Sequence, residues 1–372
     1  MKRELTYCVI GAGNGGIAMA GYLAMMGYRV NLYNRTPARI SSLMKERTIY
    51  LEGEINGCGV LNKVTDNMEE AISDVDIIMV TIPAIGHYNV AGSMAPYLRD
   101  NQIIILNPGR TGGALEVYEI LLREGKQDKI IVAEAQTFIY ACRSMEFNRA
   151  HIFKSKREVT LAAIPATRTD YVLGLINEAY PQFIPAKDVL ETSINNYGAI
   201  FHPAPTLLNS GHIERCAPFE YYIEGITPSI GNFLEKLDKE RMELGRMLQI
   251  KTLSAVEWLE ETYAAKGETI FEAIQNNSAY RGLQAPQGLD IRYIYEDVPY
   301  GLVPMESIAH TLGIKTPAIT SIIDIAQLMT NRDFREEGRS ANRLGLGGLS
   351  VAEMHMLARQ GTVVRKELEE VV

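Results

Sequence analysis

The first half of the chain alternates strand-like apolar runs with stretches of helical periodicity. The runs, most of them ending in proline or glycine turns, occupy residues 5–10, 29–34, 76–82, 102–106, 129–133 and 157–166. Continuous apolar strands separated by helices are typical of a parallel sheet that is covered on both faces. Between residues 48 and 64 the polarity alternates and the chain turns at glycine, which predicts a hairpin inserted before the next helix.

Beyond residue 185 the apolar positions recur mostly at three- and four-residue spacing, which predicts helices. The segments 227–250, 252–265 and 316–329 each open with a threonine that suits a helix N-cap, and Ser350 suits the same position before the last helix. We therefore predict an α/β domain over residues 1–185 and an all-helical domain over residues 186–372. A cleft between two such domains could receive a small substrate beside a bound cofactor.

A glycine-rich loop, GAGNGG, lies between the first strand and the first helix. Gly11 permits the tight turn, Gly13 lets the backbone approach a pyrophosphate, and Gly16 lets helix and strand pack closely. The helix N-terminus adds free N–H groups and the positive end of a dipole. The pattern predicts a Rossmann-type doubly wound sheet that binds a dinucleotide. Its predicted contacts are Gly11, Gly13, Asn14, Gly15, Gly16, Ile82 and Pro83, the last two where the 76–82 strand ends.

The end of the second strand bears on which dinucleotide is bound. Folds that prefer NAD usually carry an acidic residue there, which bonds the ribose hydroxyls. This chain has Asn34, Arg35 and Thr36 instead. Arg35 could pair with a 2′-phosphate, and Asn34 and Thr36 could donate hydrogen bonds to it. We therefore expect NADP(H) to be preferred, with NAD as the alternative.

The segment NNYGAIFHPAPTLLN, residues 195–209, places a histidine between a helix-like run and two prolines. If residues 191–201 are helical, Asn195, Gly198 and His202 lie on one face, with a gap at Gly198 over which a flat ring could rest. Pro203 biases the residue before it away from helical geometry, so the helix is expected to end or kink there. This arrangement suits a histidine that holds a ligand and transfers protons.

A catalytic histidine usually needs a carboxylate that fixes its tautomer and stabilises the imidazolium. Asp297, in DIRYIYEDVPYG, is the best candidate because it stands between aromatic residues and a proline. Periodicity does not choose between it and the adjacent Glu296. Arg292, in the same stretch, offers a bidentate clamp for a substrate carboxylate.

Composition narrows the classes of protein that fit. The chain has 372 residues, enough for two domains, and a net charge of −8 without a basic face, which argues against nucleic-acid binding. Its four cysteines, at positions 8, 58, 142 and 216, show no CxxC spacing, so neither a disulfide framework nor a metal site is expected. No run approaches the ~20 apolar residues of a membrane span. We expect a cytoplasmic protein.

With these segments in view, the chain resembles the octopine/nopaline (opine) dehydrogenase family along nearly its full length. NNYGAIFHPAPTLLN and RYIYEDVPYG carry the likeness, whereas many dehydrogenases share the glycine loop. The resemblance implies that NAD(P)H reduces an imine formed between an amino acid and a 2-oxo acid such as pyruvate. It also implies that His202 is the general acid/base, that Asp297 is its partner and that Arg292 binds substrate.

The family's ACR-like stretch beside the cofactor site maps onto residues 141–143 of this chain. The resemblance has two departures: Arg110, in NPGRTGG, and the NRT sequence that ends the second strand. Both concern the substrate and the cofactor rather than the reaction class. Arg110 or Arg143 could pin a second carboxylate beside the one that Arg292 holds. The predicted substrate contacts are therefore Arg292, Asn195, Cys142, Arg143 and Arg110.

Two other functions stay open. Ketopantoate reductases and glycerol-3-phosphate dehydrogenases reduce a ketone without an imine and use a lysine as the central acid. No lysine lies in the histidine segment, but the region 227–251 contains Lys236, Lys239 and Lys251. A nucleotide-binding redox sensor would need the glycine loop but not the imidazole, the carboxylate and the guanidinium. Helices with exposed apolar faces could also pair, so we expect a homodimer.

Overall fold

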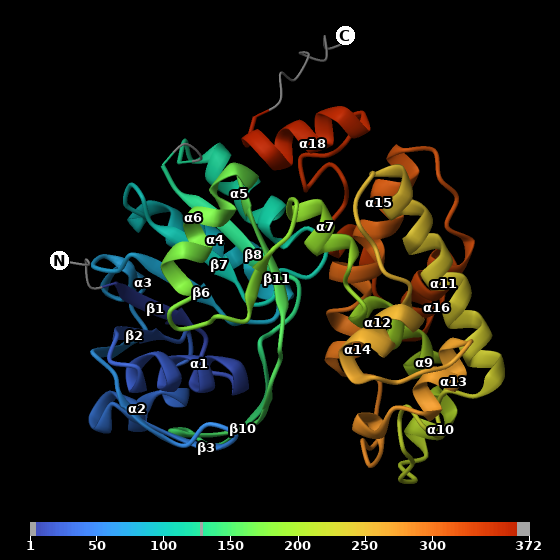
Figure 1. Cartoon of the computed structure of the whole chain (residues 1–372), viewed down its shortest axis with the longest axis horizontal. Helices are drawn as coiled ribbons and strands as arrows, with labels where there is room; N and C mark the ends of the chain where they lie inside the picture. Colours follow the sequence, from blue (N-terminus) through green and yellow to red (C-terminus); the bar gives the residue numbers. More distant parts are fainter. Residues whose placement is uncertain (1–4, 127–128, 363–372) are drawn as a thin grey trace.

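The computed structural model describes residues 5–126 and 129–362. A sheet domain and a helical domain lie side by side, the first in blue to green and the second in yellow-green to red (Figure 1). The predicted order of an α/β part followed by a helical part is confirmed, with β12 (Phe183–Pro185) as the last strand and α7 (Val189–Ile194) beginning the helical part.

The main sheet has eight strands in the order β12-β11-β8-β7-β6-β1-β2-β5. The six strands from β5 to β8 in this order are parallel. Five of them correspond to predicted apolar runs, whereas β5 overlaps the end of the segment 48–64, which the sequence predicts as a hairpin. The prediction is wrong at the other edge, where β11 runs antiparallel to β8 because a hairpin, rather than a crossover helix, connects them. The strands are β1 (Thr6–Ile10), β2 (Arg29–Tyr33), β5 (Lys63–Thr65), β6 (Ile77–Val80), β7 (Ile103–Leu106), β8 (Ile131–Ala135), β11 (Val159–Ile164) and β12 (Phe183–Pro185).

Helices cover both faces of this sheet: α1 (Asn14–Met25), α2 (Ser41–Glu46), α3 (Met68–Ile72), α4 (His87–Met94), α5 (Gly113–Arg123) and α6 (Thr169–Ile176). Successive residues of a strand point to opposite faces. In β1, Tyr7 and Val9 join the core on the α1 side, whereas Cys8 and Ile10 join the core on the α4 and α5 side. The second core continues into the helical domain, where it includes Leu234, so apolar packing joins the two domains.

A second, four-stranded sheet packs against α1 in the order β4-β3-β10-β9. The predicted hairpin over 48–64 is present as β3 (Thr48–Gly53) and β4 (Gly57–Val60). The other two strands, β9 (Tyr140–Glu146) and β10 (Arg149–Ser155), are not apparent from the sequence, because charged residues interrupt their apolar positions. They form the hairpin that returns the chain to the sheet as β11.

Helices make up the second domain, as predicted. Thr227 caps the longest of them with its side chain, and Ser350 caps the last in a capping box with Glu353, both as expected. A π-helical turn, η6 (Val298–Leu302), follows α14. After α7 the helices are α8 (Gly198–Phe201), α9 (Pro203–Leu208), α10 (Ser210–Glu214), α11 (Pro228–Met247), α12 (Ala255–Tyr263), α13 (Ile270–Gln275), α14 (Arg292–Tyr295), α15 (Val303–Thr311), α16 (Pro317–Thr330), α17 (Phe334–Glu337) and α18 (Val351–Gln360).

Two of the predicted helix caps differ in the structure. Ser254, rather than Thr252, caps α12, because its hydroxyl forms a capping box with a glutamate three residues later. Thr316 stands at the N-cap position of α16 but makes no capping hydrogen bond. The Glu240 carboxylate of α11 accepts hydrogen bonds from two first-turn N–H groups of α16 in its place. A long-range contact thus replaces a local cap.

The condition that residues 191–201 form one continuous helix is not met. Helix α7 ends before Asn195, and α8 begins after a gap. The buried guanidinium of Arg241 accounts for the break, because it donates to the last carbonyl of α7 and to Asn195 Oδ1. The chain then passes through His202 into α9, with Pro203 at its first position. The predicted helix end at His202 is therefore a kink between two short helices.

Candidate active site

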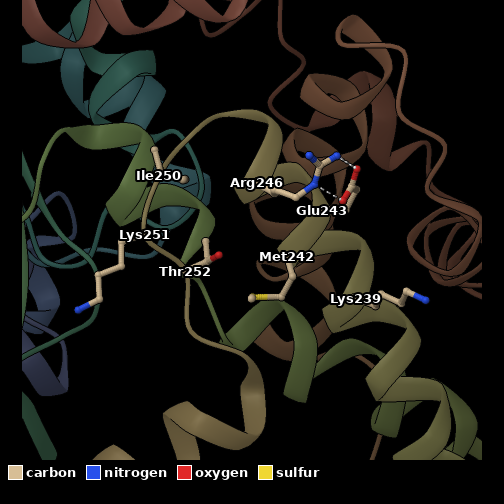
Figure 2. Close-up of a pocket in the computed structure, with 7 residues that line it drawn as sticks. All are labelled: Lys239, Met242, Glu243, Arg246, Ile250, Lys251 and Thr252. Atoms are coloured by element: carbon tan, nitrogen blue, oxygen red, sulfur yellow. Dashed lines mark hydrogen bonds and ion pairs between the residues drawn. The ribbon is translucent and has the colours of Figure 1, made fainter.

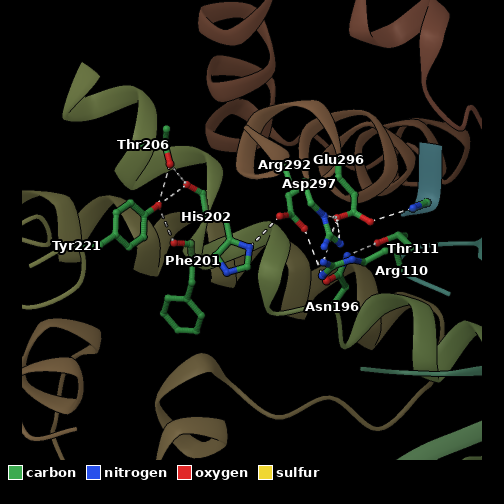
Figure 3. Close-up of polar contacts among 11 residues, drawn as sticks. Arg110, Thr111, Asn196, Phe201, His202, Thr206, Tyr221, Arg292, Glu296 and Asp297 are labelled. Carbon is green, nitrogen blue, oxygen red and sulfur yellow. Dashed lines mark hydrogen bonds and ion pairs between the residues drawn. The ribbon is translucent and has the colours of Figure 1, made fainter. Parts of the chain in front are cut away.

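His202 lies at the kink between α8 and α9 (Figure 3). Its Nδ1 is 2.8 Å from Asp297 Oδ2, so the structure brings together the two residues expected to pair. The imidazole stacks on the ring of Tyr293, with the centroids 4.2 Å apart. The hydroxyls of Tyr221 and Thr206 donate to the His202 carbonyl. These contacts hold the ring in place while 21 % of the side chain stays exposed.

The carboxylate of Asp297 is buried, with 1 % of the side chain exposed. Burial opposes its charge, but Arg110, with Nη1 3.4 Å from Oδ1, and His202 outweigh burial and lower the pKa of Asp297. The carboxylate is therefore ionised at neutral pH and accepts the Nδ1–H of His202. This assigns the free lone pair of the imidazole to Nε2.

The adjacent Glu296 points another way, which resolves the choice that periodicity leaves open (Figure 3). Its side chain is 3 % exposed, and Oε2 accepts from Arg292 Nε at 2.8 Å and from Arg110 Nη2 at 3.3 Å. Its Oε1 accepts the backbone N–H of Ala84, 2.9 Å away, in the loop after β6. Glu296 thus connects Arg292 of the helical domain to Arg110 and Ala84 of the sheet domain. Sequence reasoning names Glu296 only as a competitor of Asp297 and misses this role.

Gly198 makes room for Arg110. A Cβ at Gly198 would lie 2.8 Å from Arg110 Nη1 and 3.1 Å from Asp297 Oδ1. Any side chain there would separate the guanidinium from the carboxylate. The gap is therefore filled by Arg110, which corrects the expectation that a flat ring rests over this glycine.

Asn195 lies outside this cluster. Its side-chain amide donates to two backbone carbonyls, those of Glu191 and Lys251. The next residue, Asn196, faces the site instead and donates to Thr111 Oγ1 at 3.2 Å. The break between α7 and α8 causes this difference, because it changes which residues share a face with His202.

A buried network holds the loop that carries Arg110, residues 107–112. Arg110 itself has a φ of 61°, a backbone conformation that non-glycine residues rarely adopt. Arg339, fully buried, donates to two carbonyls of this loop and to the Glu116 carboxylate. Burial raises the pKa of Glu134 on β8, although three donors, including the hydroxyl of Ser193, contact its carboxylate. The loop is thus anchored from both domains.

The glycine loop has the geometry that a pyrophosphate requires. Gly11 has a φ of +108°, and a Cβ there would lie 2.6 Å from Ile82 Cγ2. A Cβ at Gly16 would lie 1.7 Å from the Gly11 carbonyl oxygen. At Gly13, the N-cap of α1, no described atom lies within 4 Å of that position, and no side chain caps the helix. The open backbone and the helix dipole fit the phosphates of a dinucleotide.

Asn34 supports this loop, because its Oδ1 accepts the backbone N–H of Ala12 at 3.1 Å. Its amide donates to the carbonyl of Thr36. Arg35, between them, is exposed. Of the three residues predicted to contact a 2′-phosphate, Asn34 therefore has a structural task as well, and Arg35 presents a cation at the surface.

Cys142 and Arg143 lie on β9 beside the start of α1. The Cys142 Sγ is 3.5 Å from the carbonyl oxygen of Asn14, and the Ser144 N–H donates to Asn14 Oδ1 at 3.0 Å. Burial raises the pKa of the Cys142 thiol to about 11, so it stays protonated at neutral pH. Arg143 is exposed. The structure places this stretch at the glycine loop, and the contacts described for Cys142 do not include His202.

A surface hollow of about 600 Å³ lies along α11 (Figure 2). Lys239 and Lys251, two of the lysines that could act as the acid of a ketone reductase, line this hollow. None of the residues that line this hollow takes part in the hydrogen bonds and ion pairs described for His202 and Asp297 (Figure 3). The lining residues are Lys239, Met242, Glu243, Arg246, Ile250, Lys251 and Thr252.

Over residues 5–126 and 129–362, no group of three or more His, Cys, Asp or Glu side chains is placed to hold a metal ion. In the same part of the chain, no helix is both long and apolar enough to cross a membrane.

A dinucleotide loop at one end of a parallel sheet, with Arg110 from a loop of the same domain and with a histidine–aspartate pair and Arg292 from the adjoining domain, defines a dinucleotide-dependent oxidoreductase. Residues 185–330 match the family model "NAD/NADP octopine/nopaline dehydrogenase, alpha-helical domain". Residues 6–132 match "NAD-dependent glycerol-3-phosphate dehydrogenase N-terminus".

The chain is 38 % identical to an opine dehydrogenase of Arthrobacter sp. (strain 1C), over 95 % of this chain and 98 % of that relative. The chain therefore belongs to the opine dehydrogenase family, as its resemblance implies. Structures of octopine dehydrogenase with NADH and L-arginine, and with NADH and pyruvate, share its fold with TM-scores of 0.81 and 0.80. Each is 21 % identical and covers 97 % of this chain and 99 % of its own.

Proposed function

We propose that this oxidoreductase joins an amino acid to a 2-oxo acid by NAD(P)H-dependent reductive condensation and catalyses the reverse oxidation at the CH–NH bond. The observation that carries the proposal is the 2.8 Å contact between His202 Nδ1 and Asp297 Oδ2, beside two arginines, in a member of the opine dehydrogenase family. The structures of octopine dehydrogenase with NADH and L-arginine or pyruvate support the choice of substrates. Bound NAD(P)H would supply the hydride.

His202 is the general acid/base in this proposal. Asp297 holds the Nδ1–H, which leaves Nε2 to accept a proton from the amine as its nitrogen attacks the ketone. His202 Nε2 then returns a proton to the hydroxyl formed from the ketone oxygen, and this hydroxyl departs as water when the imine forms. The Asp297 carboxylate stabilises the positive charge that the imidazole carries in between.

Arg292 and Arg110 are the proposed carboxylate-binding groups. The Arg292 side chain is 61 % exposed, and Glu296 orients its guanidinium. Burial opposes the charge of Arg110, but the carboxylates of Asp297 and Glu296 raise the pKa of its guanidinium. Arg110 is therefore a cation at any working pH. Asn195 is left out of this proposal because backbone groups occupy its amide.

For the cofactor, we propose that the loop from Gly11 to Gly16 binds the pyrophosphate, with Ile82 and Pro83 beside it and with Cys142 and Arg143 on the same side. NADP(H) is the proposed preference, because exposed Arg35 replaces the usual acidic residue. A cytoplasmic homodimer is proposed as well. Exposed apolar side chains of the helical domain, such as Leu328 with 82 % exposure, support the dimer.

The test is a matrix of amino acids and 2-oxo acids, assayed with NADH and with NADPH. We expect cofactor oxidation only when both substrates are present, and a product whose mass equals both substrates minus water plus two hydrogen atoms. Turnover with a 2-oxo acid alone would instead favour a ketone reductase. Cofactor binding without turnover for any pair would favour a redox sensor.

A further inference from the structure

Lys156 lies directly after β10, where the chain turns back to become β11. Its Nζ donates to the hydroxyl of Thr137 at 2.6 Å, and its backbone N–H donates to the carbonyl of Ile139. Thr137 follows the end of β8, at the carboxyl edge of the main sheet. Ligands of open α/β sheets bind outside this edge. The ammonium group is therefore held at the edge where a cofactor and a substrate would meet.

The same edge carries Arg110. The Gly109 N–H donates to the Ala135 carbonyl at 3.1 Å, so the loop of Arg110 runs along the end of β8, two residues before Thr137. Burial, together with repulsion from the Arg110 charge, lowers the pKa of Lys156 to about 8. The fold thus places two cations at the same edge of the sheet, where the charge of one lowers the pKa of the other.

No carboxylate among the described residues balances the charge of Lys156. Its described side-chain contact is a neutral hydroxyl, and Arg110 is the charged group that acts on it. The carboxylates of the site are already engaged, since Glu296 contacts Arg110 and Arg292, and Asp297 contacts Arg110 and His202. At neutral pH three cations, Lys156, Arg110 and Arg292, therefore face two carboxylates. Holding like charges close together costs free energy that a bound anion would offset.

We propose that Lys156 and Arg110 together bind one of the two substrate carboxylates, and that Arg292 binds the other. The proposal rests on the proposed function, because an amino acid and a 2-oxo acid each bring one carboxylate and the condensed product carries both. A single exposed arginine cannot orient two carboxylates at separate positions. A second cationic site is needed so that the amine and the ketone meet in reacting geometry.

A cofactor phosphate is the competing anion, and the packing around Thr137 argues against it. The next residue, Phe138, packs against the glycine loop, where a Cβ on Gly15 would lie 2.6 Å from its ring. Lys156 instead contacts Thr137 and lies in the field of Arg110. The Phe138 ring therefore packs against the glycine loop, whereas the Lys156 ammonium lies in the field of Arg110.

The experiment compares Lys156→Met and Lys156→Arg with the wild-type enzyme. Lys154→Met is the matched control, because Lys154 is two residues away, is 72 % exposed and pairs with Glu54. Loss of a charge-assisted hydrogen bond should raise the KM of one carboxylate substrate by about tenfold to a hundredfold. We expect a smaller change in kcat, an unchanged KM for NAD(P)H, near-complete recovery in Lys156→Arg and no effect in Lys154→Met.

The substrate whose KM rises identifies the carboxylate, and either answer supports the proposal. Unchanged KM values for both substrates, or a rise confined to NAD(P)H, would overturn it. If the wild type shows no amine-dependent turnover, the proposed function fails, and calorimetric titration of pyruvate into NADPH-loaded wild type and Lys156→Met still tests the lysine. Should Lys156→Met not fold, as judged by its thermal melt, Lys156→Gln provides the same comparison.

Discussion

Replacing Asp297 by asparagine removes a charge from His202 while changing the volume little. The carboxylate is 1 % exposed, and Oδ2 lies 2.8 Å from the imidazole Nδ1. An asparagine amide that donates to Nδ1 would leave the proton on Nε2, the wrong tautomer for accepting a proton from the amine. An asparagine that accepts from Nδ1 would keep the tautomer but would not stabilise the imidazolium. Both arrangements predict a lower kcat.

The size of the loss follows from the role assigned to His202. General acid/base catalysis is typically worth ~10²–10⁴ in rate, or about 3–6 kcal/mol at ~1.4 kcal/mol per decade. A hydrogen bond that merely positioned a neutral ring would be worth about 1 kcal/mol, or roughly fivefold. Arg110 loses one anion in the variant but keeps Glu296. We therefore expect kcat to fall by about two to four decades and the KM values to rise much less.

The assay is steady-state turnover with both substrates saturating, normalised to folded enzyme. Asp290→Asn is the matched control, because Asp290 is exposed in the same segment. A loss of less than about fivefold in kcat would refute the argument that Asp297 activates His202. A lower melting temperature with kcat retained would assign Asp297 to packing alone.

Three further measurements test other contacts of the site. Gly198→Ala should lower kcat/KM by about a hundredfold because its Cβ displaces Arg110, whereas Gly174→Ala, with no described atom within 4 Å, should not. Arg35→Ala should raise the KM for NADPH by about tenfold or more and leave that for NADH within about twofold; equal changes would contradict a 2′-phosphate contact. The KM of the substrate that Lys156 binds should be flat below pH about 8 and rise above it, since the ammonium is protonated below its pKa of about 8 and loses its charge above it. Arg110, the charged group facing Lys156, does not titrate there, and Lys156→Arg should remove the rise.

Local signals in the sequence account for the parts of the fold that are predictable. The first strand, the glycine loop and α1 follow one another without long-range help, and the apolar runs give five of the six parallel strands, all but β5. The antiparallel edge is not predictable in this way, because it depends on an unrecognised hairpin. The break before Asn195 is not predictable either. Arg241 lies 46 positions away and donates hydrogen bonds to the end of α7 only in the folded chain.

In the candidate site, too, local signals predict some residues, and others depend on long-range packing. The chemical need of a histidine for a carboxylate, together with the family resemblance, points to His202 and Asp297 although 95 positions separate them. The places of Asn196, Glu296 and Lys156 depend on the register of broken helices and on which loops meet at the sheet edge. Periodicity carries no information about such contacts. Residue type suggests the chemistry, and tertiary packing selects the residue.

Glu296 shows why the substrate and cofactor sites should be coupled. One oxygen of its carboxylate accepts the Ala84 N–H, next to the strand end that lies against the glycine loop, and the other holds Arg292 and Arg110. Arg292 uses Nε and Nη2 for this contact. A guanidinium has five N–H donors, so Nη1 can still bind a carboxylate without breaking the pair. Glu296 therefore orients Arg292, and a single buried carboxylate connects this arginine to the loop that follows β6.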